Sequence, residues 1–297
     1  MAYIIGIDAG GTSTKAVAYT TAGHELGRFK AGSANPAAAG LQQAAHNLER
    51  VIALCREQWG EEVDYILIGA AGVETGQLKP QLLSMMRELN PKSIVDLISD
   101  ALLVLEARLE DRDGIALIAG TGSVAWGKQG RRTHRVGGWG HLIGDLGSGY
   151  AIAMQAIREM AACIDSGQPV NPLGEQIMKH LQINSWRGIV DFVYQSDKAG
   201  IASLLPMLEQ AAVEQDQTAV ALFNEAVTHL CQMTCLCANV LQISRPHVAA
   251  SGSVLQRIPI VQEQFSRQME QQMPGSVIDY QPVDANRAAL YRYRKMQ

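Results

Sequence analysis

Cysteine is scarce in this chain and never occurs as a C-x-x-C pair. An odd number of thiols disfavours a disulfide framework, and the absence of C-x-x-C pairs disfavours a zinc ribbon. We therefore expect reduced thiols in a cytoplasmic protein. The five cysteines are Cys55, Cys163, Cys231, Cys235 and Cys237.

Long apolar runs are also missing. No stretch reaches the ~18 apolar residues that a membrane-spanning helix needs. The apolar run at the start, residues 3–7, follows no basic segment and is broken by Asp8, so it does not fit a signal peptide. No membrane partner is expected.

Charge is low and balanced, with 25 basic and 29 acidic residues and a net charge of −4. No basic stripe alternates with aromatic residues, so nothing favours nucleic acid as a partner. With 47% hydrophobic residues the chain is a globular protein, and its 297 residues suggest two domains at ~100–200 residues each.

The pattern along the chain is that of an α/β protein. Two halves each open with a strand, a glycine turn and a second strand, and a tight boundary lies near residues 112–114. Two such halves are expected to flank a cleft. The predicted strands are 3–8, 14–19, 65–69, 94–98, 115–118, 124–126 and 248–250, and the predicted helices are 41–59, 77–89, 150–163, 202–214, 218–241 and 286–295.

Two glycine turns, residues 9–12 and 120–123, are candidate phosphate loops. Backbone N–H groups without neighbouring Cβ atoms can approach phosphate oxygens closely, although each turn alone could be a plain hairpin. Their recurrence at the start of both halves favours phosphate binding. Residues 122–128 have P-loop spacing but continue with Gln129, and Gly10-Gly11 leads into a strand rather than a helix, so neither a P-loop nor a dinucleotide fingerprint is present.

Two aspartates lie at the carboxyl ends of predicted strands, Asp8 as the last residue of one and Asp100 just after another. Asp8 could hold Mg²⁺ through water, or it could be a turn residue. Asp100 comes at the carboxyl end of a strand, where open α/β sheets bind ligands, and it could also cap the helix that begins at residue 101. Both roles are compatible in one side chain.

The densest glycine cluster spans residues 137–149 and contains Trp139, His141 and Asp145. An aromatic face suits a sugar ring, and a carboxylate accepts hydrogen bonds from paired hydroxyls. The alternative is a glycine-rich loop packed on Trp139.

Together these motifs resemble the BadF/BadG/BcrA/BcrD ATPase family. The resemblance is closest to its N-acetylglucosamine kinases, which belong to the actin/hexokinase/heat-shock-ATPase superfamily. It covers essentially the whole chain, with the motifs in the family order. They are Gly6-Ile-Asp-Ala-Gly-Gly-Thr-Ser-Thr-Lys15, Ser99-Asp-Ala101, Ala119-Gly-Thr-Gly-Ser123, Gly137-Gly-Trp-Gly-His-Leu-Ile-Gly-Asp145 and Ala250-Ser-Gly-Ser-Val254.

The resemblance implies an α/β fold of two ribonuclease-H-like, actin-like ATPase domains flanking a nucleotide and sugar cleft. The first domain would comprise residues 1–113, with a C-terminal helix, 285–297, returning to it. The second would comprise residues 114–284.

The resemblance also implies roles for individual residues. Asp100 matches the catalytic base, and Asp8 lies near the metal, Mg²⁺. The positions matching ATP-binding residues are Gly10, Gly11, Thr12, Lys15, Gly120, Thr121, Gly122, Ser251, Gly252 and Ser253. The positions matching contacts to the amino sugar are Asn35, Asp100, Ser123, Val124, Trp139, Gly140, His141 and Asp145.

Three positions depart from the family pattern. Leu146 stands where the family usually has Glu, which leaves the identity of the sugar open. Ser251 replaces the first glycine of the adenosine motif. Residues 284–287 replace a small Gly-Ala pair, and the sequence alone offers no physical reason for them.

The expected activity is ATP-dependent phosphorylation of an N-acetylated amino sugar, N-acetylglucosamine at O6 first of all. N-acetylmuramic acid and glucosamine are the alternative substrates, and a homodimer is compatible with the resemblance. Family members that activate a partner enzyme hold an iron–sulfur cluster on cysteines, but only Cys163 lies near the mid-chain glycine loops. A sugar-sensing repressor would need a DNA-binding helix pair ahead of Asp8, which only seven residues precede.

Overall fold

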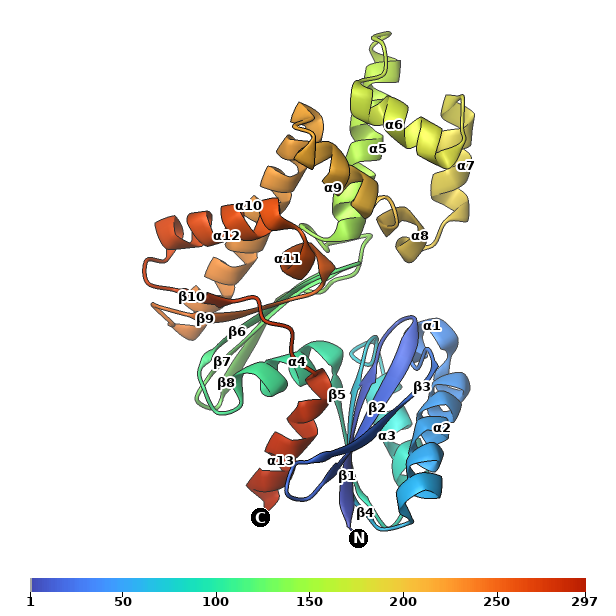
Figure 1. The fold of residues 1–297 in the computed structure, drawn as a ribbon, viewed down its shortest axis with the longest axis vertical. Helices are drawn as coiled ribbons and strands as arrows, with labels where there is room; N and C mark the ends of the chain where they lie inside the picture. The colour runs from blue at the N-terminus through green and yellow to red at the C-terminus, as the bar shows by residue number, and fades with distance from the viewer. Residues whose placement is uncertain (1) are drawn as a thin grey trace. The chain divides into compact units, whose positions relative to one another are not determined.

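Two five-stranded sheets organise the chain, one in each of two units (Figure 1). The structure is a computed structural model and describes residues 2–297. Unit 1 comprises Met1–Arg112 and Val283–Gln297, and unit 2 comprises Asp113–Pro282. The chain therefore leaves unit 1, builds all of unit 2 and then returns.

The sheet of unit 1 has the strand order β3-β2-β1-β4-β5. The first three strands form antiparallel pairs, whereas β1, β4 and β5 run parallel. The carboxyl ends of these three parallel strands therefore lie at one edge of the sheet. The strands are β1 (Tyr3–Ala9), β2 (Ser13–Thr20), β3 (Glu25–Gly32), β4 (Val63–Ala70) and β5 (Ile94–Ser99).

Helices cover both faces of this sheet, which explains why its central strands are mostly apolar and buried. Ile5 and Ile7 pack in the core that includes α2 and α3, whereas Ile4 packs with α4, η1 and α13 on the other face. The alternation follows from the two-residue period of a strand. The helices are α1 (Pro36–Ala39), α2 (Leu41–Trp59), α3 (Leu78–Leu89), α4 (Asp100–Leu109), η1 (Ala285–Arg287) and α13 (Ala288–Met296).

The returning segment 284–287 passes directly over β1. Asp284 begins η1, since the backbone N–H of Asn286 donates to its Oδ1 at 3.1 Å. A Cβ on Gly6 would lie 2.2 Å from the carbonyl oxygen of Asn286, so only glycine allows this crossing. Residues 284–287, for which the sequence alone gave no reason, therefore cap η1 and carry the returning chain across β1.

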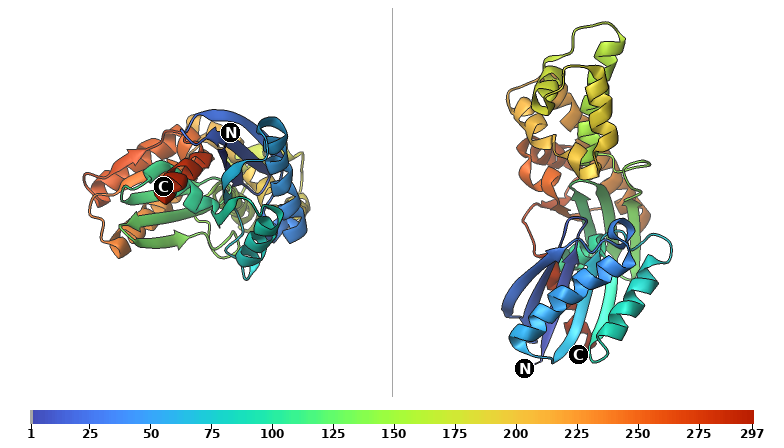
Figure 2. Two further views of the ribbon diagram at one scale, coloured as in Figure 1. Left: turned by 90° about the horizontal axis from the view of Figure 1, so that it is seen from below. Right: turned by 90° about the vertical axis from the view of Figure 1, so that its right-hand side faces the viewer.

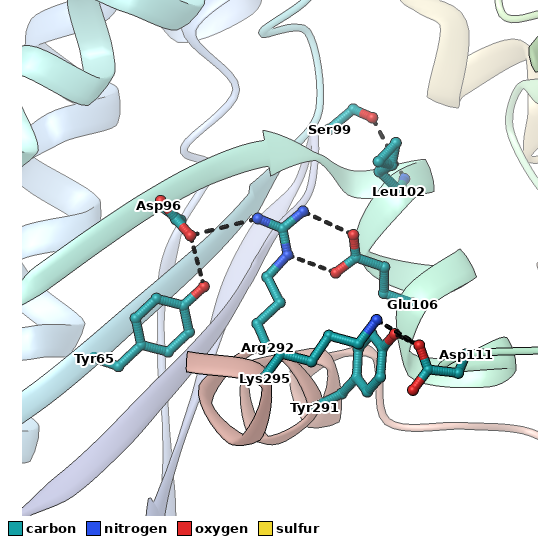
Figure 3. Close-up of polar contacts among 9 residues, drawn as sticks. All are labelled: Tyr65, Asp96, Ser99, Leu102, Glu106, Asp111, Tyr291, Arg292 and Lys295. Atoms are coloured by element: carbon teal, nitrogen blue, oxygen red, sulfur yellow. Dashed lines mark hydrogen bonds and ion pairs between the residues drawn. The ribbon is translucent and has the colours of Figure 1, made fainter. Parts of the chain in front are cut away.

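Arg292 of α13 joins three elements of unit 1 (Figure 3). Its guanidinium donates to both carboxylate oxygens of Glu106 on α4, at 2.6 and 2.7 Å, and to Asp96 on β5 at 3.4 Å. The Tyr65 hydroxyl of β4 donates to the same Asp96 carboxylate at 2.9 Å. This network fixes α13 against the helix that Asp100 begins.

The sheet of unit 2 has the order β10-β9-β6-β7-β8, and the parallel pair β6 and β9 lies at its centre. One large core joins this sheet to α5, α10 and α12. The helices α6 and α7 lie at the end of this unit away from its sheet (Figures 1 and 2). The elements are β6 (Gly114–Ala119), β7 (Ser123–Gln129), β8 (Arg132–Gly137), α5 (Gly149–Asp165), α6 (Pro172–Leu181), α7 (Trp186–Gln195), α8 (Lys198–Ala202), α9 (Leu205–Val213), α10 (Gln217–Leu241), β9 (His247–Ser251), α11 (Ser253–Arg257), α12 (Pro259–Gln272) and β10 (Val277–Asp279).

The predicted helix over residues 202–214 is wrong at its start. Pro206 occupies the first turn of α9, and a proline there fits a helix start but not a helix interior. The chain therefore ends α8 at Ala202 and begins a new helix at Leu205. Within residues 2–297, none of the helices combines the length and the apolarity that crossing a membrane requires.

Candidate functional site

The first glycine turn joins β1 to β2. The Gly10 N–H donates to the Ser13 carbonyl at 3.0 Å, which closes the turn. Neither Gly10 nor Gly11 has a positive φ, and a Cβ on Gly11 would meet no atom within 4 Å. The fold itself does not require glycine at position 11, so the bare backbone is free for a ligand to approach.

Acidic side chains gather beside this turn at the carboxyl edge of the parallel strands. Burial raises the pKa of the Asp8 carboxyl above its usual range, the charges of Asp100 and Asp284 raise it further, and Lys15 opposes the shift. A divalent cation would relieve this repulsion. Among residues 2–297 no three His, Cys, Asp or Glu side chains form a metal cage.

Asp100 is the first residue of α4, directly after β5. The helix cap is its neighbour Ser99, whose Oγ accepts from the Leu102 N–H at 3.4 Å. Asp100 Oδ1 accepts from the N–H of Ala101 at 2.8 Å, which orients the carboxylate. The capping role expected for Asp100 is thus mainly carried by Ser99.

Asn35 caps the short helix α1. Its Oδ1 accepts from the N–H groups of Ala37 and Ala38 at 2.9 and 3.2 Å. A Cβ on Gly72 would lie 2.2 Å from the same oxygen. The amide NH₂ of Asn35 is therefore the group that could donate to a sugar hydroxyl.

In unit 2 the second glycine turn lies against the turn after β9. Gly120 donates to the Gly122 carbonyl at 2.9 Å, and Gly149 donates to the Gly120 carbonyl at 2.7 Å. Gly252 has φ +91°, and a Cβ there would lie 2.3 Å from the Ala119 carbonyl oxygen. Because β6 and β9 are parallel neighbours, residues 120–122 and 251–253 lie side by side. Ser251 is buried, whereas Thr121 is exposed.

Asp145 is buried, with 4% of its surface exposed, and has an unusual φ of +58°. Its Oδ1 accepts from the N–H of Ser123 at 3.4 Å, and its Oδ2 pairs with Lys198 at 2.5 Å. The Ser123 hydroxyl donates to the Leu146 carbonyl at 2.7 Å. Sequence reasoning missed Lys198, because it lies 53 residues away on α8 and belongs to no motif.

The middle of the loop, residues 139–143, is largely exposed, whereas residues 147–149 are buried. Trp139 is 65% exposed, with the Arg135 guanidinium 4.9 Å from its ring centroid. The His141 ring meets Tyr150 edge to face at 4.9 Å. Val124 fills the space in which a Cβ on Gly138 would lie, at 3.0 Å. Four glycines of the loop, Gly137, Gly138, Gly140 and Gly147, have positive φ, so backbone geometry explains much of the glycine density.

The sites expected from the sequence form one group in each unit. Unit 1 holds Asp8, the first glycine turn, Lys15, Asn35 and Asp100, and the Asp8 carboxyl senses the charges of Lys15 and Asp100. Unit 2 brings the second glycine turn, residues 251–253 and Asp145 around β6 and β7. The assignment of these residues to ATP and sugar stays a prediction.

Residues 5–289 match the sequence profile of the BadF/BadG/BcrA/BcrD ATPase family. The chain belongs to this family. The resemblance expected from the motifs is therefore confirmed, and membership of an ATPase family implies the use of ATP.

Named relatives match the chain over most of its length. It is 30% identical over 276 residues to the N-acetylmuramic acid/N-acetylglucosamine kinase of Clostridium acetobutylicum, covering 90% of each chain. It is 26% identical over 294 residues to the N-acetyl-D-glucosamine kinase of Dictyostelium discoideum, covering 92% of each.

The fold also matches a solved structure. A proposed N-acetylglucosamine kinase from Chromobacterium violaceum superposes with a TM-score of 0.80, at 21% identity over 98% of both chains. At this identity the match concerns the fold, and it confirms the two-domain, actin-like α/β architecture that the motifs implied.

Proposed function

We propose that this protein is an ATP-dependent kinase that phosphorylates an N-acetylated amino sugar, with N-acetylglucosamine at O6 as the first candidate. N-acetylmuramic acid and glucosamine are the alternatives. The observation that carries the proposal is the 30% identity over 90% of both chains to a kinase named for two N-acetylated amino sugars. Units 1 and 2 would serve as the two domains of this kinase, with the boundaries near residues 113 and 284.

The glycine turns would bind the phosphates of ATP. Backbone N–H groups of residues 11–12 and 121–122 would supply donors, because those of Gly10 and Gly120 already close the turns. Lys15 would supply a positive charge, and residues 251–253 would contact the adenosine. The bare backbone at Gly11 supports this role for the first turn. Asp8 would hold Mg²⁺ through water, and the ion would neutralise charge on the transferred phosphoryl group.

Asp100 would act as the general base. Its carboxylate accepts the proton of the sugar O6 hydroxyl as that oxygen bonds to the γ-phosphorus, and the bond from the γ-phosphorus to the bridging oxygen breaks to release ADP. Asp100 lies where α4 begins, at a helix start that Ser99 caps, and its Oδ1 accepts from the Ala101 N–H. Phosphoryl transfer depends chiefly on such positioning.

Several side chains are proposed to contact the sugar. Asn35 offers its amide NH₂, Asp145 accepts from ring hydroxyls, and the exposed face of Trp139 covers the ring. The remaining proposed contacts are Ser123, Val124, Gly140 and His141.

A coupled ADP-release assay tests the proposal. Purified protein with Mg-ATP is assayed with N-acetylglucosamine, N-acetylmuramic acid, glucosamine, glucose and no sugar. We expect turnover that depends on an N-acetylated sugar. ADP release that ignores every sugar would contradict the kinase assignment and indicate an ATPase that acts on a partner protein.

A further inference from the structure

The ion pair between Asp145 and Lys198 is built into unit 2. The Asp145 carboxylate is 4% exposed and the Lys198 side chain 30% exposed, with 2.5 Å between Oδ2 and Nζ. A carboxylate this deeply buried is costly unless a partner compensates its charge. Lys198 supplies that partner from α8, a helix that packs against α5.

The pair also lies against the second glycine turn. A Cβ on Gly122 would lie 2.6 Å from Lys198 Nζ and 2.9 Å from Asp145 Oδ2. A side chain at position 122 would collide with the ion pair, so glycine is needed there. Three segments meet here: the turn 120–123, the loop 137–149 and the start of α8.

The charges around the proposed sugar-binding loop do not favour a cation. Asp145 and Lys198 cancel each other, and residue 146 is a half-exposed leucine rather than a second acid. Arg135 adds a positive charge beside the exposed ring of Trp139. Among these side chains Asp145 is the only acid, and Lys198 neutralises it.

We propose that Lys198 determines which charge class of amino sugar the protein accepts. This inference rests on the proposed kinase function. By neutralising Asp145, Lys198 lets the carboxylate accept hydroxyl hydrogen bonds without attracting the ammonium group of glucosamine. The protein then discriminates in favour of neutral or acidic N-acetylated sugars and against the cationic free amine.

The test compares kcat/KM for glucosamine with kcat/KM for N-acetylglucosamine at one neutral pH. Replacement K198M leaves Asp145 unneutralised, and we expect the ratio to rise about tenfold, equivalent to about 1.4 kcal/mol. K198R keeps the charge and should keep the wild-type ratio. K179M is the matched control, because Lys179 is an exposed lysine of α6 in the same unit.

A second variant keeps the test decisive if K198M does not fold. D145N removes the opposite charge, and asparagine tolerates the left-handed backbone of this position. Here the ratio should fall about tenfold, with Lys198 left unpaired. In the double variant D145N/K198M the ratio should return toward that of the wild type.

Two results would overturn the inference while leaving the kinase function intact. One is a wild-type protein that phosphorylates glucosamine in preference to N-acetylglucosamine. The other is a ratio that K198M and D145N leave unchanged, or that K179M shifts equally. Failure of the wild type to phosphorylate any sugar would instead contradict the proposed function itself.

Discussion

Asp100 tests the proposed chemistry at the scale of one residue. In D100N the amide oxygen can still accept from the Ala101 N–H, so the start of α4 should be preserved. The side chain can no longer accept the sugar proton, and we expect kcat to fall about 10²–10⁴-fold. Coupled assays measure kcat, and calorimetric titration with ATP checks that nucleotide binding is unchanged. A near-normal kcat would remove Asp100 from the role of base.

The charged carboxylate of Asp8 lowers the stability of the folded protein, and its proposed role in holding Mg²⁺ explains why the residue is there. Its pKa is raised above the unfolded value of ~3.9, chiefly by burial, so the folded state binds the proton more tightly. Stability therefore falls as pH rises through the window above ~3.9, and the cost is fully present at pH values above the raised pKa.

The variant D8N removes this charge. We expect its free energy of unfolding to exceed that of the wild type at pH 7, with the difference shrinking toward pH 4, while its Mg-ATP turnover falls about 10²-fold. Denaturant titrations at both pH values measure the first effect and the coupled assay measures the second. A D8N protein less stable than the wild type at pH 7 would be inconsistent with this account.

Sequence reasoning found the residues whose signal is local. Asp8 lies at the end of β1 and Asp100 directly after β5, and the topology brings these strand ends to one edge of the sheet. Lys198 gave no such signal, because its partner Asp145 lies 53 residues away and only tertiary packing joins them. The role of residues 284–287 could not be predicted either, because it depends on the close tertiary contact between Asn286 and Gly6.

At the scale of elements, the close approach of β9 to the turn after β6 can be tested with alanine. In G252A a Cβ would collide with the Ala119 carbonyl, and φ is +91°. We expect about 1–3 kcal/mol lower stability and weaker ATP binding. G167A is the matched control, because Gly167 also has positive φ but a Cβ there meets nothing within 4 Å. Thermal unfolding and ATP titration of both variants separate the effect of the collision from that of backbone strain. Equal losses of stability and of ATP affinity in G252A and G167A would contradict a special role for the contact between Gly252 and Ala119.

Helices and strands with a regular spacing of apolar residues could be predicted from the sequence, and those without such a spacing could not. The apolar spacing of α2 and α10 and the β-branched run of β1 predicted these elements. The edge strand β3 contains two glycines and no buried residue, so its pattern resembles a loop. Helix α12 begins without a side-chain cap, which removed the usual start signal.

For the whole molecule, the path of the chain matters more than any single contact. Unit 1 contains both the first and the last residues that the structure describes, and all of unit 2 is inserted between them. One core of unit 1 is incomplete without Ala288, Ala289 and Leu290, which pack with Ile4 and Leu67. Arg292 then ties the same helix to Glu106 (Figure 3).

The path of the chain determines the order in which the two units can complete folding during translation. On the ribosome, at ~5–20 residues per second, unit 2 emerges entirely before the segment that unit 1 still needs. A nascent chain stalled with residue 282 just outside the exit tunnel should hold a protease-resistant unit 2 and a protease-sensitive unit 1. Protection of residues 1–112 in such a chain would contradict this order. The half of the protein that is translated first is thus the half that matures last, because one face of its sheet is incompletely covered until residues 285–290 have emerged.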